Sequence, residues 1–136
     1  MIYIFGDSHA NANMYDFDLP HTYLHQVAIT MHRIGRDNNI INFDESYNRE
    51  GNTFILFYGE IDCRCHIHKQ LQQGRKLEDI VEELVSNYFK TISNNITKYK
   101  QIIIGSVTPP VCKLFHESKF GVITHEFPIL GSNEER

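Results

Sequence analysis

The sequence predicts an α/β fold in which helices flank a parallel sheet. Short, continuously apolar runs recur along the chain, as is typical of strands buried on both faces of a parallel sheet. A long amphipathic segment separates the last two runs and has the spacing of a helix that packs on a flat surface. No repeat or linker-like tract interrupts the 136 residues, so we expect a single domain spanning 1–136.

Four apolar stretches account for the strands of this sheet. The first strand is predicted at residues 2–5, where a β-branched and aromatic run ends at Gly6. Residues 24–30 form the second apolar stretch, and residues 54–58 are a stronger strand candidate. A run of isoleucines at 102–104 predicts the fourth strand.

The clearest helix lies between the third and fourth apolar stretches. Acidic residues crowd its amino end and lysines its carboxyl end, which complements the helix dipole. The segment from Asp37 to Tyr47 is ambiguous between helix and loop. The apolar residues of the long helix recur at steps of three, one or four and are Leu77, Ile80, Val81, Leu84, Val85, Tyr88, Phe89, Ile92 and Ile96.

Composition and charge exclude several classes of partner. Thirteen lysines and arginines against seventeen acidic residues give a net charge of −4, without the basic stripe that nucleic-acid binding needs. No apolar run reaches the ~20 residues of a membrane span, and the amino terminus does not resemble a signal peptide. The chain has three cysteines, Cys63, Cys65 and Cys112. Because an odd number does not suit a disulfide framework, we expect reduced thiols and a cytoplasmic protein.

Candidate functional residues follow the predicted strands, because ligands of open parallel sheets bind at the carboxyl ends of the strands. The three segments of interest are 6–9, 59–66 and 105–110. Ser8 follows the first strand near the start of a helix, where backbone N–H groups can stabilise an oxyanion, and this placement suits a nucleophile. In the alternative interpretation, Asp7 or Ser8 simply caps the next helix.

Three blocks in this part of the chain resemble those of the SGNH (GDSL-like) hydrolases. Phe5-Gly6-Asp7-Ser8-His9 resembles the block that carries the family's nucleophilic serine, and Tyr58-Gly59-Glu60-Ile61-Asp62-Cys63-Arg64-Cys65-His66 looks like a G-E-I-D-C-R variant of its G-x-N-D block. Residues 30–37 lie between them, where the family places an oxyanion-hole glycine. The resemblance covers residues 5–66 and implies a flavodoxin-like, three-layer fold.

The resemblance implies roles for particular residues. Ser8 would be the catalytic nucleophile, and its own backbone amide with that of Gly35 would form the oxyanion hole. Ile61 stands where the family has an asparagine donor, so Arg64 or a backbone amide would have to replace it. No cofactor and no metal are expected. The residues expected to bind substrate or order the loops are Asp7, His9, Glu60, Asp62, Arg64 and His66.

The carboxyl-terminal part departs from the family. The family takes its general base from a late D-x-x-H block. The late histidines here are His116 and His125, and neither has an aspartate three residues before it, because those positions hold Lys113 and Val122. A capping-box pattern beginning at Ser132 predicts a helix start just before the chain ends; in the alternative interpretation it is a polar tail that matches the pattern by chance. We therefore expect a truncated domain that lacks its last helix and strand, with self-association through the uncovered sheet edge.

Three functions follow as hypotheses. The first is an esterase or O-acyltransferase that acts on a small or carbohydrate ester, such as an O-acetylated sugar, through an acyl-serine; without the base, activity of this chain alone would be weak. The second is an inactive remnant that binds a small ligand or partner without turnover. The third is a metal module at Cys63, Cys65, His66 and His68, although alternating residues of an extended segment point to opposite sides.

Overall fold

The computed structural model describes residues 1–7, 9, 10, 14, 16–25, 28–107, 113–122 and 128–132. Within these residues, strands alternate with helices through most of the chain. The elements in chain order are β1 (Ile2–Gly6), β2 (His21–His25), α2 (Met31–Asp37), the short 3-10 helix η1 (Glu45–Tyr47), β3 (Thr53–Phe57), the π-helical turn η2 (Asp62–His66), α3 (Ile67–Leu71), α4 (Leu77–Asn95), β4 (Gln101–Ile104) and α5 (Lys113–Phe120).

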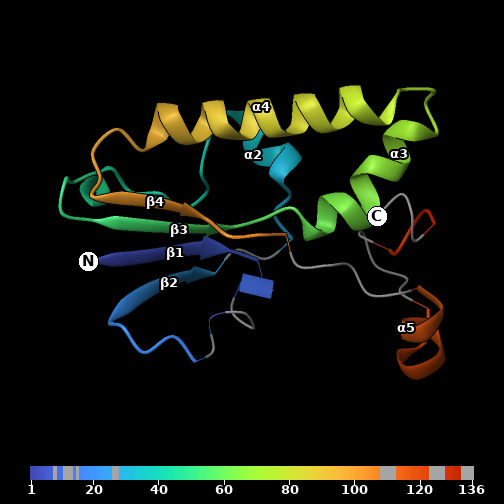
Figure 1. Ribbon diagram of the computed structural model, residues 1–136, viewed down its shortest axis with the longest axis horizontal. Coiled ribbons are helices and arrows are strands. Elements are labelled where there is room, and N and C mark those ends of the chain that lie inside the picture. The colour runs from blue at the N-terminus through green and yellow to red at the C-terminus, as the bar shows by residue number, and fades with distance from the viewer. Residues whose placement is uncertain are drawn as a thin grey trace.

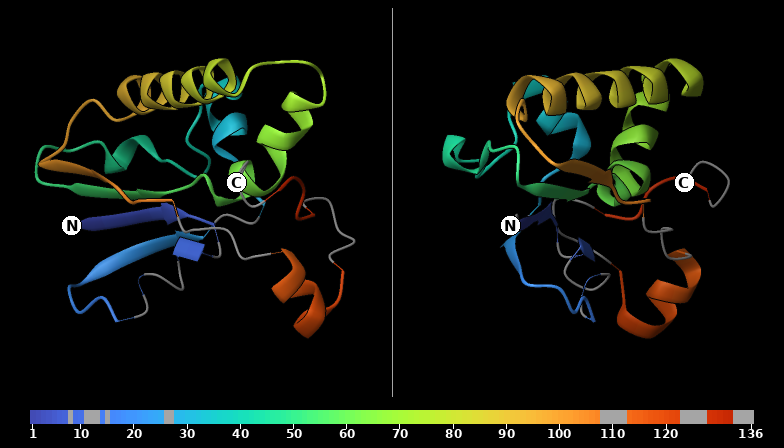
Figure 2. Two further views of the ribbon diagram at one scale, coloured as in Figure 1. Left: turned by 45° about the vertical axis from the view of Figure 1, so that its right-hand side comes forward. Right: turned by 60° about the vertical axis from the view of Figure 1, so that its left-hand side comes forward.

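The strands form one four-stranded sheet in the order β2-β1-β3-β4, and every neighbouring pair is parallel. Ile2 of β1 lies opposite His21 of β2 and Thr53 of β3, and Thr53 lies opposite Gln101 of β4. Helices α2 and α4 lie on one side of the sheet and α5 lies on the other (Figures 1 and 2). This arrangement confirms the predicted α/β class and is consistent with a flavodoxin-like fold.

The core lies between the sheet and the helices α2 and α4. Phe5 of β1 and Phe54 of β3 point toward these helices and are fully buried, together with Tyr88 of α4. Ile4 and Ile55 are buried on the opposite face of the same two strands. Each such side chain contributes about 1.5–3 kcal/mol on burial. Burial on both faces explains why the two central strands have continuously apolar sequences.

Most predicted elements agree with the structure to within one residue at each end. The exception is the second apolar stretch, because β2 ends at His25, near the beginning of the stretch expected at 24–30. Thr30 instead caps α2, since its side chain accepts a hydrogen bond from the backbone N–H of Arg33. As an edge strand, β2 is less apolar than the two central strands, so hydrophobicity alone misplaced it.

The structure resolves the ambiguous segment 37–47. Helix α2 ends at Asp37, and Asn38 follows in the left-handed conformation. A single 3-10 turn forms at Glu45–Tyr47 and is capped by Asp44, whose carboxylate accepts from the backbone N–H of Ser46. The segment is therefore an irregular connection with one short helical turn.

The segment expected to be an extended loop at 59–66 is helical instead. A helix begins at Glu60, passes through the π-helical turn η2 and continues as α3. Cys63 and Cys65 lie in η2 as free thiols, whereas Cys112 lies outside the described residues. None of the helices described is both long and apolar enough to cross a membrane.

Candidate functional site

The carboxyl ends of β1 and β3 meet at one edge of the sheet, where Gly6 lies opposite Phe57. Gly6 must be a glycine, because a Cβ atom there would come within 2.3 Å of the Ala10 side chain and 2.7 Å of the Phe57 carbonyl oxygen. This close approach brings Asp7, after β1, next to Glu60, which follows β3. The structure therefore brings together two of the predicted strand-end segments.

A small, shallow pocket of about 10 Å³, roughly the space for one water molecule, opens at this edge. The third predicted strand-end segment also reaches it, through Ser106 after β4. We call it the strand-end pocket, and it is lined by Asp7, His9, Phe57, Tyr58, Glu60 and Ser106.

His9 lies between two buried carboxylates of this pocket. Its backbone N–H donates to Asp7 Oδ1 at 2.9 Å, and its ring Nδ1 is 3.3 Å from the same oxygen. The other ring nitrogen, Nε2, is 3.6 Å from Glu60 Oε2. Asp7 is 3% exposed and Glu60 6%, yet Asp7 Oδ2 and Glu60 Oε2 have no hydrogen-bond partner among the described residues. The pocket thus contains buried acceptor oxygens whose hydrogen-bonding capacity is not used within the described part of the chain.

Glu60 is electrostatically unusual. Burial raises the pKa of its carboxyl above the ordinary value of 4.5, and the positive charge of Arg64 and the neighbouring His9 partly offset this effect. Arg64 lies one helical turn later, with its Nε 3.2 Å from Glu60 Oε1. A carboxyl with a raised pKa can exchange a proton closer to neutral pH, which is a requirement for acid–base chemistry.

Asp62 has a different role from its neighbours. Its carboxylate is fully buried and accepts hydrogen bonds from the backbone N–H groups of Met31, at 2.6 Å, and His32, at 3.0 Å. Burial raises its pKa to about 6, although these two hydrogen bonds oppose the shift. Asp62 therefore ties the turn after β3 to the start of α2, which supports loop ordering rather than substrate contact.

Gly35 lies in the second turn of α2, against α4. A Cβ atom at Gly35 would come within 2.8 Å of the Asn87 Cβ, so close packing of the two helices requires a glycine here. Its backbone N–H lies within the helix, where such groups bond to the carbonyl four residues earlier. The placement gives Gly35 a packing role and does not support its expected role in an oxyanion hole.

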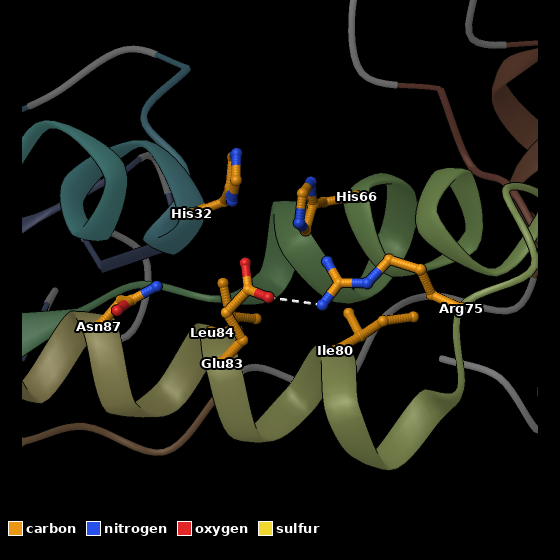
Figure 3. Close-up of a pocket in the computed structure, with 7 residues that line it drawn as sticks. All are labelled: His32, His66, Arg75, Ile80, Glu83, Leu84 and Asn87. Carbon is orange, nitrogen blue, oxygen red and sulfur yellow. Dashed lines mark hydrogen bonds and ion pairs between the residues drawn. The ribbon is translucent and has the colours of Figure 1, made fainter.

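His66 also departs from expectation, because it points away from the strand-end pocket. It lines a second small pocket, of about 10 Å³, together with His32 of α2 and the ion pair of Arg75 and Glu83 (Figure 3). The rings of His32 and His66 stack with centroids 4.0 Å apart and an interplanar angle of 22°. Asn87, Ile80 and Leu84 of α4 complete the lining.

Burial determines the protonation of this histidine pair. It lowers the pKa of His66 to about 4, with further lowering by His32 and the positive charge of Arg75. The pKa of His32 is also lowered, first by burial and then by Arg36. Both rings are therefore neutral at pH 7, which allows them to stack without repulsion.

Two contacts of the site were not foreseen. The hydroxyl of Tyr23 in β2 donates to the Asp7 carbonyl oxygen at 2.6 Å, and the Leu130 N–H donates to the Arg64 carbonyl oxygen at 2.9 Å. Neither residue has a sequence signal, because both contacts join segments far apart in the chain. Tyr23 supports the turn after β1, and Leu130 brings a late segment against η2.

Several sequence predictions lie outside the described residues. These are Ser8, His125 and residues 133–135 of the capping-box pattern. Among the residues that are described, no group of three or more histidines, cysteines, aspartates or glutamates is arranged to hold a metal ion. Cys63, Cys65 and His66 lie within the helical turn η2. The expectation that alternate residues of an extended segment point to opposite sides was therefore wrong.

The chain matches no protein-family model, and no curated protein or solved structure is significantly similar to it. The candidate site therefore has to be interpreted from its own geometry.

Proposed function

We propose that the protein is an SGNH-like serine esterase or O-acyltransferase that acts on a small ester, such as an O-acetylated sugar, through an acyl-serine at Ser8. One observation carries the proposal. The three sequence blocks on which the resemblance depends, 5–9, 30–37 and 58–66, converge at the carboxyl edge of the sheet.

Specific contacts join these blocks. The contact between His9 Nε2 and Glu60 Oε2, at 3.6 Å, connects the first block to the third. The hydrogen bonds from Met31 and His32 to Asp62 connect the second block to the third. Chain segments about 30 to 50 residues apart therefore contact one another at the edge where open parallel sheets bind ligands.

The proposed reaction begins with attack of the Ser8 oxygen on the ester carbonyl carbon. A new C–O bond forms to Ser8, the bond to the alcohol breaks, and the serine proton leaves with the alcohol. His9 and Glu60 are the proposed proton carriers, because the His9 ring lies 3.6 Å from the Glu60 carboxyl and burial raises the pKa of that carboxyl toward neutral pH. Water, or a second alcohol, then releases the acyl group.

The decisive experiment is labelling with a fluorophosphonate probe, which reacts with activated serines. We expect labelling of the wild-type protein and none in Ser8→Ala. Ser106→Ala is the matched control, because Ser106 lines the same pocket and is exposed. Labelling that persists in Ser8→Ala and disappears in Ser106→Ala would assign the nucleophile to Ser106 instead.

A second candidate function is ligand binding without turnover. It is favoured by Asp7 Oδ2 and Glu60 Oε2, which are buried acceptors without a hydrogen bond to any residue that the structure describes. A small rearrangement of the pocket would let them accept from the hydroxyl groups of a sugar. Titration of Ser8→Ala with an O-acetylated monosaccharide separates the two functions. Binding without ester cleavage by the wild type would support the second candidate and contradict the first.

A further inference from the structure

Asp7 directly follows β1, and its buried carboxylate contacts His9 in two ways. Asp7 Oδ1 accepts a hydrogen bond from the backbone N–H of His9 at 2.9 Å. The same oxygen lies 3.3 Å from the ring nitrogen Nδ1 of His9. The first contact is that of an ordinary helix cap, whereas the second involves the imidazole, which capping does not require. Asp7 therefore acts on the ring of His9 as well as on its backbone.

The contact with Asp7 determines which nitrogen of the neutral His9 ring carries the proton. A neutral imidazole has one N–H and one unprotonated nitrogen, and a carboxylate only accepts hydrogen bonds. A proton on Nδ1 can be donated to Asp7 Oδ1, whereas a proton on Nε2 would leave two acceptors, Nδ1 and Oδ1, 3.3 Å apart. The tautomer with its proton on Nδ1 is therefore favoured, and Nε2 then carries the free lone pair.

The other ring nitrogen, Nε2, remains open to the strand-end pocket. His9 lines this pocket, and its side chain is 36% exposed. Nε2 lies 3.6 Å from Glu60 Oε2, which is beyond hydrogen-bond distance. An unprotonated ring nitrogen in this position can accept a proton from a group that enters the pocket.

The backbone of Asp7 is held by contacts with several parts of the chain. Its carbonyl oxygen accepts hydrogen bonds from the Tyr23 hydroxyl, at 2.6 Å, and from the Ala10 backbone N–H, at 3.1 Å. The preceding Gly6 packs so closely on Phe57 that no side chain fits there. The side chain of Asp7 is only 4% exposed. A buried carboxylate held in this way can keep a neighbouring imidazole in one tautomer and one orientation.

We propose that Asp7 is a positioning residue that holds His9 in the tautomer with its proton on Nδ1, so that Nε2 is the basic nitrogen of the strand-end pocket. The tautomer follows from the contacts alone, whereas its use in catalysis rests on the proposed ester chemistry. On this proposal, the base lies within the segment 7–9 itself. The chain then does not depend on a late D-x-x-H block for its base.

The proposed reaction uses Nε2 of His9 in both directions. The proton of the attacking serine hydroxyl passes to Nε2 as the new C–O bond forms. The ring then carries a proton on each nitrogen, and the Nδ1–H remains directed at the negative charge of Asp7, which stabilises this cation. Nε2 next gives its proton to the oxygen of the departing alcohol, and the ring returns to its first tautomer.

Nitrogen-15 NMR of the histidine side chains in the full chain tests the tautomer. A two-bond ¹H–¹⁵N correlation spectrum at pH 8 distinguishes protonated from unprotonated ring nitrogens, and His9→Gln identifies the His9 signals by their loss. We expect a protonated Nδ1 and an unprotonated Nε2, the reverse of the tautomer that predominates in free histidine. His21 is the internal standard, because its Nδ1 lies 2.8 Å from the Leu19 carbonyl oxygen and is also expected to carry the proton.

The variant Asp7→Ser separates the effect on the ring from the effect on the cap. Serine can still cap a backbone N–H, but its hydroxyl both donates and accepts and therefore imposes no tautomer. We expect the ratio of Nδ1–H to Nε2–H at His9 to fall at least tenfold, and the rate of fluorophosphonate labelling to fall at least tenfold. Asp44→Ser is the matched control, because Asp44 caps the backbone N–H of Ser46 in a different turn, and it should change neither value.

Two results would overturn the proposal. One is a wild-type His9 that carries its proton on Nε2, or on both nitrogens, at pH 8. The other is an Asp7→Ser variant that keeps the wild-type tautomer. A changed tautomer in Asp7→Ser without slower labelling would contradict the catalytic use of Nε2. Failure of the proposed function gives a different result, in which His9 has its proton on Nδ1 but the wild type shows no labelling; the positioning role of Asp7 would then be supported without the ester chemistry.

Discussion

Two groups of buried carboxylates follow the central strands, and they differ in how their oxygens are used. Both oxygens of Asp62 accept hydrogen bonds from the backbone of α2. In contrast, Asp7 and Glu60 each retain an oxygen without a hydrogen-bond partner among the described residues. A satisfied buried carboxylate stabilises the fold, whereas an unsatisfied one lowers stability and retains hydrogen-bonding capacity that the fold does not use. A buried carboxylate therefore has a structural role at Asp62, whereas those of Asp7 and Glu60 suit a functional role.

The largest expected effect is at Asp62. Asp62→Ala leaves the N–H groups of Met31 and His32 without an acceptor, and we expect it to lower the free energy of unfolding by about 3 kcal/mol. Urea denaturation measures this loss. Asp44→Ala is the control, because that carboxylate also caps a backbone N–H but is exposed, and its loss is expected to be much smaller. Equal effects of the two variants would contradict the structural role assigned to Asp62.

A substitution at Gly35 tests whether this residue has a role in helix packing or in the proposed reaction. Gly35→Ala introduces a Cβ atom 2.8 Å from Asn87, and we expect an overpacking loss of about 1–3 kcal/mol in urea denaturation. Gly51→Ala is the control, because no atom lies within 4 Å of the Cβ position there. An unchanged stability in Gly35→Ala, together with a loss of ester cleavage, would restore the expected oxyanion role.

Glu60 is expected to behave in the opposite way to Asp62. Glu60→Gln preserves an acceptor for Arg64 and removes a charge that burial already disfavours, so its unfolding free energy should change by less than about 1 kcal/mol. Ester cleavage or ligand binding at the strand-end pocket should nevertheless fall. A loss of stability as large as that of Asp62→Ala would show that Glu60 too is structural, and the contrast between the two carboxylates would disappear.

The smallest effect is a change in the pH dependence of stability. The pKa of His66 is lowered to about 4 in the folded protein from the ordinary 6.5, so the folded state disfavours its proton. The stability that depends on neutral His66 is complete above pH 6.5 and decreases as the pH falls toward 4. Asp62, whose pKa is raised to about 6, acts in the opposite sense, because its protonation at lower pH favours the folded state.

The variant His66→Asn isolates the histidine contribution. We expect the midpoint of thermal unfolding to fall less between pH 7 and pH 4.5 in His66→Asn than in the wild type, by the linkage between protonation and folding. His68→Asn, two residues beyond the end of η2, is the matched control and should follow the wild type. Parallel profiles for the wild type and His66→Asn would contradict the lowered pKa.

The sequence predicted the fold better than it predicted the site. Apolar runs located β1, β3, β4 and α4, because burial determines the hydrophobicity of these elements. The apolar pattern misplaced β2, because this strand lies at the edge of the sheet and has a less apolar sequence. The strand-end rule correctly placed Asp7, Glu60 and Ser106 at one pocket.

The direction of individual side chains could not be predicted. His66 was expected at the strand-end pocket, but it stacks on His32 because the segment is helical rather than extended. Gly35 matched a motif position, yet the contact with Asn87 depends on how two helices pack. Both outcomes depend on tertiary contacts, which local sequence patterns do not encode.

The π-helical turn η2 separates the two residues by which one short helix lines both pockets. Relative to an α-helix, a π turn accommodates one additional residue, which rotates everything that follows by about 100°. Glu60 at the start of this helix faces the strand-end pocket, and His66 at the end of η2 faces His32 in the second pocket. Deleting a single residue from η2 would restore ordinary helical winding and turn the imidazole away from α2. The one additional residue of η2 therefore determines which side of the helix carries His66.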